Sequence, residues 1–221
     1  INNPQWEERD RLILSIGHTA PVLYATLAEA GFYPKDETLT LRKFGSRLQG
    51  HPSRDFKLPG VETSAGSLGQ GLGIAIGMAL SAKMDDMNYR TYCVMGDGEL
   101  QEGSVWEAAM AASNYRLDNL CAIIDRNKLQ IDGSTENVMA LEPLAEKWSS
   151  FGWNVVEIDG HDHNDIIDAF AIARATIGQP TLVLANTVMG KGVKSIENDN
   201  KWHGKVPSKD DLDKFLNELY C

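Results

Sequence analysis

Residues Gly96–Gly133 read GDGELQEGSVWEAAMAASNYRLDNLCAIIDRNKLQIDG, and an apolar run, Thr91–Met95, leads into them. A second apolar run, Leu120–Asp125, lies inside the stretch. Both runs are apolar at successive positions, which is typical of central parallel strands covered on both faces. Between them, Gly103–Tyr115 is rich in glycine, alanine and serine and has the length of a helix. The stretch therefore predicts a strand, a helix and a second strand of one parallel sheet.

Segments of the same two kinds alternate along the rest of the chain. The predicted strands are Leu12–Ser15, Thr91–Met95, Leu120–Asp125, Asn154–Ile158 and Thr181–Thr187. The predicted helices are Gly69–Met84, Gly103–Tyr115, Asn164–Thr176 and Lys209–Tyr220, the last preceded by a variant capping box of Ser208 and Asp211. This alternation predicts an α/β fold with a doubly wound, mostly parallel sheet and helices on both of its faces. Gly45–Ser67 and Gly190–Pro207 lack periodicity and predict long, functional loops.

Composition limits the possible functions. With 221 residues, of which 43% are hydrophobic, we expect residues 1–221 to form one domain. The net charge of −10 argues against nucleic-acid binding and against docking on an anionic membrane, and no apolar run is long enough to span a bilayer. Cys93, Cys121 and Cys221 form no CxxC pair, which suits a reducing cytoplasm. The chain begins at Ile1 in sequence typical of a domain interior, so we expect a preceding N-terminal segment.

Polar residues follow two of the predicted strands. Asp97 comes directly after the strand Thr91–Met95, and Asn127 comes just after the strand Leu120–Asp125. The carboxyl ends of neighbouring parallel strands meet at one edge of a sheet, where ligands bind. Carboxylate and amide oxygens suit a hard cation that also carries a phosphate. A Gly-Asp-Gly tripeptide is also a common turn, and both readings stay open on these residues alone.

At this point the sequence resembles a known family. Gly96–Gly133 resembles the thiamine-diphosphate motif, which opens with GDG and closes with an asparagine, and it is most similar to the transketolase family. Further matches occur in order along the chain: LSIGH (14–18), GHP (50–52), PGVETSAGSLGQG (59–71), FGW (151–153), DGHD (159–162) and WHGKVP (202–207). The resemblance covers nearly the whole chain. It implies that the chain is the N-terminal, diphosphate-binding subunit of a split transketolase.

The resemblance assigns a cofactor and a metal. It implies that thiamine diphosphate binds with Mg²⁺, or with Ca²⁺ or Mn²⁺ in its place. The implied metal ligands are Asp97, Asn127 and the carbonyl oxygen of Leu129. The implied cofactor-binding residues are His18, Gly66, Leu68, Gly96, Gly98, Asn127 and His203.

Three histidines match positions where the family has active-site imidazoles. The resemblance places His18 and His203 near the diphosphate and the sugar hydroxyls, and His51 near the reactive carbon of the cofactor. All three are implied catalytic residues. His161 and His163 have no such role. Glu102 matches a carboxylate at the family's subunit contact, although a glutamate in the first turn of a helix is also favoured by the helix dipole.

The resemblance also implies an activity and a partner. We expect transfer of a two-carbon ketol unit from a ketose or ketose phosphate to an aldose or aldose phosphate. The family's pyrimidine-binding domain, with its activating glutamate, is absent from this sequence. We therefore expect the partner to be a C-terminal transketolase subunit, in a heterotetramer with two copies of each chain.

Three alternatives are weighed against this hypothesis. One is a thiamine-diphosphate-dependent synthase or dehydrogenase subunit that decarboxylates a 2-oxo acid. Another is a non-catalytic homologue, because a fold alone does not establish activity. A nicotinamide site at Gly71–Gly77 is disfavoured, because no apolar strand leads into that glycine-rich loop. The sequence leaves open the sugar pair and the roles of Glu102 and Lys191.

Overall fold

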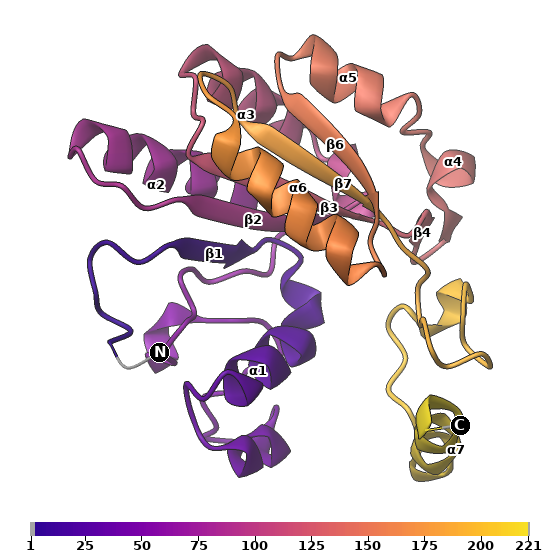
Figure 1. The fold of residues 1–221 in the computed structure, drawn as a ribbon. Helices are drawn as coiled ribbons and strands as arrows, with labels where there is room; N and C mark the ends of the chain where they lie inside the picture. Colours follow the sequence, from indigo (N-terminus) through magenta and orange to yellow (C-terminus); the bar gives the residue numbers. More distant parts are fainter. Residues whose placement is uncertain (1–2, 221) are drawn as a thin grey trace.

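The computed structural model describes residues 3–220, and Figure 1 shows their fold. Five parallel strands form one sheet in the order β1-β2-β3-β7-β6. Their bounds are Arg11–Leu14 (β1), Thr91–Gly96 (β2), Leu120–Arg126 (β3), Asn154–Asp159 (β6) and Thr181–Asn186 (β7). The five predicted strands and the α/β class are therefore confirmed, with no boundary shifted by more than one residue. Ile1, before which a segment is expected, and Cys221 lie outside the described residues.

Seven helices and several short elements connect these strands in the described part of the chain. The helices are α1 (Ala20–Glu29), α2 (Gly71–Met84), α3 (Gly103–Asn114), α4 (Thr135–Val138), α5 (Leu144–Ser150), α6 (His163–Ala175) and α7 (Lys209–Tyr220). The 3-10 turns are η1 (Gly17–Thr19), η2 (Lys35–Thr40), η3 (Arg54–Phe56), η4 (Gly98–Gln101) and η5 (Asn200–Trp202), and β4 (Leu129–Gln130) with β5 (Gly133–Ser134) forms a small hairpin. The four predicted helices are present, whereas α1, α4 and α5 have no counterpart in the sequence prediction.

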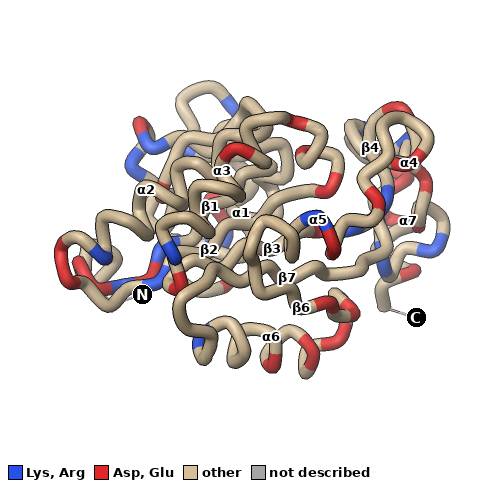
Figure 2. The backbone as a smooth tube through the Cα atoms, turned by 90° about the horizontal axis from the view of Figure 1, so that it is seen from above, with Lys and Arg blue, Asp and Glu red and all other residues tan. Residues whose placement is uncertain are grey.

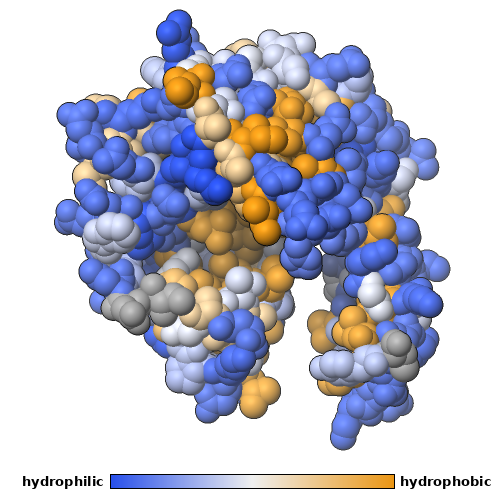
Figure 3. Space-filling model, in the orientation of Figure 1, coloured by the Kyte–Doolittle hydropathy of each residue, from blue (hydrophilic) through white to orange (hydrophobic). Residues whose placement is uncertain are grey.

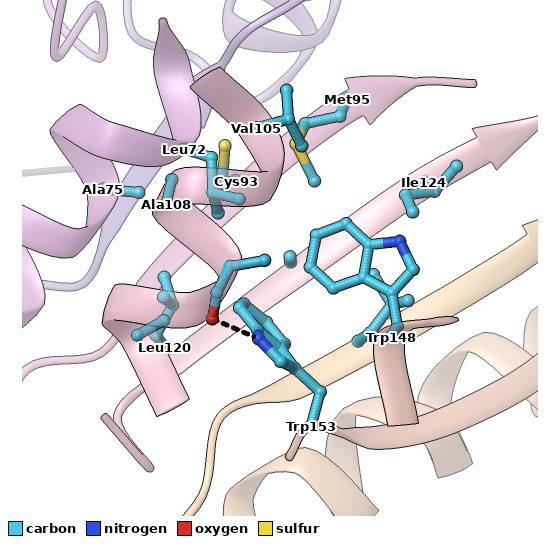
Figure 4. Close-up of a cluster of buried hydrophobic side chains, with 14 of the residues drawn as sticks. Leu72, Ala75, Cys93, Met95, Val105, Ala108, Leu120, Ile124, Trp148 and Trp153 are labelled. Carbon is cyan, nitrogen blue, oxygen red and sulfur yellow. Dashed lines mark hydrogen bonds between the residues drawn. The ribbon is translucent and has the colours of Figure 1, made fainter. Parts of the chain in front are cut away.

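Side chains of the central strands alternate between two apolar layers. On β3, Leu120 and Ile124 belong to the larger core cluster, whereas Cys121 belongs to the cluster under α6. Figure 4 shows the larger cluster, where Trp148 and Trp153 lie over the sheet beside residues of α2 and α3. Because both faces of the sheet are covered, the central strands are apolar at successive positions over most of their length.

A separate apolar cluster surrounds α1, next to the β1 edge of the sheet. Eight buried residues form it: Ala20, Leu23, Tyr24, Leu27, Ala28, Tyr33, Leu48 and Leu58. In Figure 1 this part of the chain lies below the sheet, on the side of β1. The cluster packs the loop after residue 45 against α1 and thereby fixes where that loop enters the site described below.

The helix α7 lies apart from the sheet. Its start is capped as expected, because the Asp211 amide donates to Ser208 Oγ (3.1 Å) and the Ser208 amide donates to Asp211 Oδ2 (2.9 Å). Phe215 packs edge-on against Trp202, with ring centroids 5.1 Å apart. Figure 3 shows a gap between the part of the molecule that carries α7 and the part that carries α1.

The surface carries charges of both signs. Figure 2 shows acidic and basic residues interspersed along the backbone. No helix within residues 3–220 is both long enough and apolar enough to cross a membrane.

Candidate functional site

A cavity of about 470 Å³ lies where β2 and β3 end and where the segments after β1 and β7 meet. Its lining comes from segments far apart in the sequence. The residues are Ile16, His18, Thr19, Leu68, Gly96, Asp97, Gly98, Glu99, Gln101, Glu102, Asp125, Asn127, Leu129, Gln130, Ile131, Met189, Gly190, Ile196, Trp202 and His203. This is the sheet edge at which ligands bind in open parallel sheets.

Asp97 is fixed at the floor of the cavity by three hydrogen-bond donors. The residue is 1% exposed. Oδ1 accepts a hydrogen bond from the Gly98 amide at 2.7 Å, and Oδ2 accepts from Arg126 Nη1 at 3.0 Å and from the Lys128 amide at 2.5 Å. Burial raises the pKa of Asp97, and the Lys128 and Arg126 donors oppose that rise. The carboxylate therefore has one orientation relative to the cavity.

A tight turn after β3 places Asn127 and Leu129 beside the same cavity. Lys128 has a left-handed backbone (φ 65°), which reverses the chain directly after Asn127. Asn127 Oδ1 accepts from the Leu129 amide at 2.9 Å. Both Asn127 and Leu129 line the cavity with Asp97. An added side-chain carbon on Gly98 would lie 3.1 Å from Gln130 Cβ, so Gln130 would have to shift slightly to admit a larger residue there.

The buried carboxylate of Glu99 links three segments of the cavity wall. It accepts hydrogen bonds from the Ser15 hydroxyl, from the Gly69 amide (2.8 Å) and from the Gly96 amide (3.3 Å). Ser15 Oγ accepts in turn from the Gly71 amide at 3.1 Å. Burial raises the pKa of Glu99, while these donors stabilise its ionised form. Because all three partners of Glu99 are donors, an acceptor-only carboxylate suits this position.

Two of the three predicted active-site histidines, His18 and His203, line the cavity. His18 follows β1 and His203 follows η5, yet their ring centroids are 5.2 Å apart. Partial burial lowers the pKa of His18, and the charges of His203 and His51 lower it further. His51 is exposed and lies outside the cavity lining, beside Gly66, where a Cβ would be 3.8 Å from its ring.

The other predicted residues divide between the cavity and its surroundings. Leu68, Gly96 and Gly98 line the cavity, whereas Gly66 does not. Glu102 also lines it, and its Cβ lies where a side chain on Gly69 (φ +79°) would clash, at 2.7 Å. The catalytic and binding roles given to these residues remain predictions.

The donor set fits a divalent ion that carries a diphosphate. Asp97, Asn127 and the Leu129 carbonyl are hard oxygen donors of the kind that Mg²⁺ and Ca²⁺ bind. Within residues 3–220 no three His, Cys, Asp or Glu residues converge as a metal cluster. A site here would therefore use one carboxylate and two neutral oxygens, and the diphosphate would supply the remaining negative charge.

Three residues that the sequence prediction omitted are central to this arrangement. Arg126 is buried and holds Asp97, and Glu99 is buried and links the segments of the cavity wall. Trp202 lines the cavity. Arg126 could have been noticed as a cation that ends an apolar strand, and Glu99 as a carboxylate next to the Gly-Asp-Gly turn. Their burial and their partners depend on tertiary structure, which sequence spacing does not show.

Comparisons with known proteins identify the family of the chain. Residues 1–219 match the family model described as "Transketolase, thiamine diphosphate binding domain". The chain is 46% identical to one subunit of the apulose-4-phosphate transketolase of Phocaeicola vulgatus, over 99% of this chain and 77% of that protein. It is also 46% identical to a 6-deoxy-6-sulfo-D-fructose transketolase subunit of a Clostridium species, over 89% of this chain and 71% of that one.

Solved structures give the same result. The transketolase of Campylobacter jejuni superposes with a TM-score of 0.91 at 32% identity, over 99% of this chain and 35% of that chain. The described fold therefore corresponds to about a third of that transketolase. The family match, the relatives and the structural similarity agree, and the chain belongs to the transketolase family as its N-terminal thiamine-diphosphate-binding domain.

Proposed function

We propose that the chain holds thiamine diphosphate and a divalent metal in the cavity and serves a transketolase that transfers two-carbon ketol units between sugars. The observation that carries this proposal is the convergence of Asp97, Asn127 and Leu129 with His18 and His203 around one cavity. Oxygen donors at strand ends suit a metal diphosphate, and imidazoles in the cavity lining suit a polar substrate.

Each part of the cavity has a proposed task. Asp97, Asn127 and the Leu129 carbonyl would hold the metal, and Gly96 and Gly98 would leave room for the diphosphate. Leu68, Ile131, Met189 and Ile196 add apolar surface, which would exclude water from the cofactor ring. Gly66 lies beside His51 at the edge of this surface.

The histidines would act on protons and developing charge. Thiamine diphosphate, when bound, supplies the carbanion chemistry that breaks and forms the carbon–carbon bond beside a carbonyl. The lowered pKa of His18 favours its neutral imidazole, which can accept or donate a hydrogen bond at a substrate hydroxyl. His51 and His203 would orient hydroxyls and stabilise oxyanions on the substrate.

The active enzyme would require a partner chain. The names of the relatives from Phocaeicola vulgatus and Clostridium describe subunits. A C-terminal subunit would supply the pyrimidine-binding domain, and two copies of each chain would form the heterotetramer. The names of these relatives also point to a sugar or sugar-phosphate substrate. The free, buried thiols of Cys93 and Cys121 are consistent with a reducing, cytoplasmic location.

Cofactor binding to an Asp97→Ala variant tests the proposal. Removal of the only carboxylate in the proposed donor set should abolish metal-dependent binding of thiamine diphosphate. Calorimetric titration with Mg²⁺ present and absent measures this binding, and circular dichroism checks that the fold is kept. Undiminished metal-dependent binding by the folded variant would refute the proposed site.

A further inference from the structure

We propose that His161 is a positioning residue that holds one wall of the cavity in place by accepting a hydrogen bond from the Val188 amide. This wall is the cavity loop, residues 187–203, which follows β7 and carries Trp202 and His203. The inference rests on the proposed function, because it concerns residues that would surround the cofactor. His161 lies outside the cavity lining, so it would act through the loop and not on cofactor or substrate directly.

The imidazole of His161 contacts the cavity loop near the start of the loop. The Val188 amide donates to His161 Nε2 at 2.8 Å, and it has no other acceptor among residues 3–220. The next residue, Met189, lines the cavity. An imidazole that accepts at Nε2 is neutral and carries its proton on Nδ1. One side-chain atom therefore fixes the backbone one residue before the loop enters the cavity.

The turn that carries His161 packs closely against the same part of the loop. The Gly160 amide donates to the Asn186 carbonyl oxygen at 2.8 Å. A Cβ on Gly160 would lie 2.5 Å from Thr187 Cγ2 and 3.1 Å from the Asn186 carbonyl oxygen. A larger residue at position 160 would therefore push the turn away from the loop. The close approach at Gly160 brings the imidazole of the next residue within reach of the loop.

The last strand residues of β3 hold the loop from the other side. Thr187 Oγ1 donates to Asp125 Oδ1, and the Thr187 amide donates to the Arg126 carbonyl oxygen at 3.2 Å. Val188 follows this anchor directly. Loss of the His161 bond would leave the anchor at Thr187 in place and free the loop that follows it.

Contacts within the loop pass the position of its start on to the rest of it. The Asn198 amide donates to the Met189 carbonyl oxygen at 3.0 Å. A Cβ on Gly190 would lie 3.0 Å from Ile196 Cγ1, so these two parts of the loop are in close contact. Five residues of the loop line the cavity: Met189, Gly190, Ile196, Trp202 and His203. A shift at the start of the loop would therefore move side chains that surround the cavity.

Two substitutions separate the hydrogen bond from the shape of the ring. His161→Gln keeps a side-chain acceptor, whereas His161→Phe keeps a planar ring and has no acceptor. His161 is exposed, so both variants should fold, and circular dichroism checks this. His163→Phe is the matched control, because His163 is exposed two residues away, at the start of α6, and is not the acceptor for Val188.

Hydrogen exchange and cofactor affinity are the readouts, measured on the full chain with its partner subunit where assembly requires one. Without cofactor, the cavity loop should exchange faster in His161→Phe than in the wild type, and at the wild-type rate in His161→Gln and in the control. In calorimetric titration with Mg²⁺ present, His161→Phe should bind thiamine diphosphate about fivefold more weakly, which is the size of one net hydrogen bond. His161→Gln and the control should keep the wild-type affinity.

The pH profile of cofactor affinity is a third readout. Protonation of the imidazole removes its acceptor, whereas the Gln side chain keeps one. The affinity of the wild type should therefore fall more than that of His161→Gln between about pH 8 and about pH 5, the range in which histidines change charge. Four charged residues line the open groove that contains position 161: Glu157, Asp159, Asp165 and Lys191. They are the same in both proteins, so the difference between the two profiles belongs to position 161.

The outcomes distinguish the inference from the proposed function. Wild-type exchange and wild-type cofactor affinity in His161→Phe would overturn the inference and leave the proposed function intact. Equal losses in His161→Gln and His161→Phe would also overturn it, because the ring and not the acceptor would then hold the loop. A wild type that binds no thiamine diphosphate would overturn the proposed function, and the exchange rates would still decide the contact between His161 and the loop.

Discussion

His18 and His203 come from distant parts of the sequence, and the short distance between their rings determines the charge that they can carry. Burial lowers the pKa of His18 most, and the charge of His203 lowers it further. Replacing His203 with Asn removes one like charge, so the pKa of His18 should rise toward its ordinary value and stay below it, because the burial remains. NMR titration of the His18 ring in the cofactor-free protein measures this. A fall in the pKa would contradict the assigned cause.

His51 should affect turnover more than cofactor affinity. It lies beside Gly66 and outside the cavity lining, and its predicted contact is with reacting atoms. We expect His51→Ala to lower kcat by about 10²-fold or more, the usual contribution of a positioned proton-transfer group, with little change in cofactor affinity. Steady-state kinetics at saturating cofactor, together with a cofactor titration, separate the two effects. A normal kcat with collapsed affinity would show that the role is misassigned.

At this scale the sequence predicts the residues that follow strands and misses those that support them. Asp97 and Asn127 could be placed together because strand ends in a parallel sheet share an edge. Arg126 and Glu99 could not be placed in the same way, because charged residues are usually exposed. Only the tertiary structure shows that these two are buried and paired. The same limit explains His51, whose match to a family motif does not show that it lies beside the cavity and not in its wall.

The helix α7 contributes to the cavity although none of its residues lines it. Phe215 is 8% exposed and packs on Trp202, which does line the cavity. Phe215→Ala should free α7 and Trp202 and lower cofactor affinity several-fold, while the sheet keeps its stability. Hydrogen exchange of α7, together with a cofactor titration, tests this. Leu216→Ala on the same helix is the control, because Leu216 is 39% exposed.

Elements were predictable where local signals agreed. The structure confirms the capping box of Ser208 and Asp211 at the start of α7. It also confirms β2 and β3, which were predicted from their apolar runs. The helix α1 was missed although its sequence, APVLYATLAE, has Pro21 in the first turn. Its cluster packs mainly against loops and meets the sheet only at Leu14, the last residue of β1. The strand–helix alternation that organised the prediction therefore does not include it.

The molecule as a whole exposes apolar side chains on helices that also cover the sheet. Met84 on α2 is 75% exposed, and Met110 on α3 is 55% exposed. We expect this chain alone to show no ketol transfer, because the pyrimidine half of the cofactor would remain in water without a partner. Mixing the chain with a C-terminal subunit should make it active. A coupled assay with a ketose phosphate and an aldose phosphate, run beside size measurement of the mixture, tests this. Full turnover by the chain without a partner would overturn it.

The strand order also determines when the sheet can form during synthesis. Of the five strands β7 is made last, yet it lies between β3 and β6, and β6 pairs with no other strand of the described chain. A nascent chain that ends before Thr181 can therefore pair only β1, β2 and β3, which would leave the β3 edge open and β6 without a partner. Unpaired strand edges invite association with other chains. We therefore expect ribosome-bound chains of this length to associate more readily than the full-length chain, and the emergence of β7 to end this exposure.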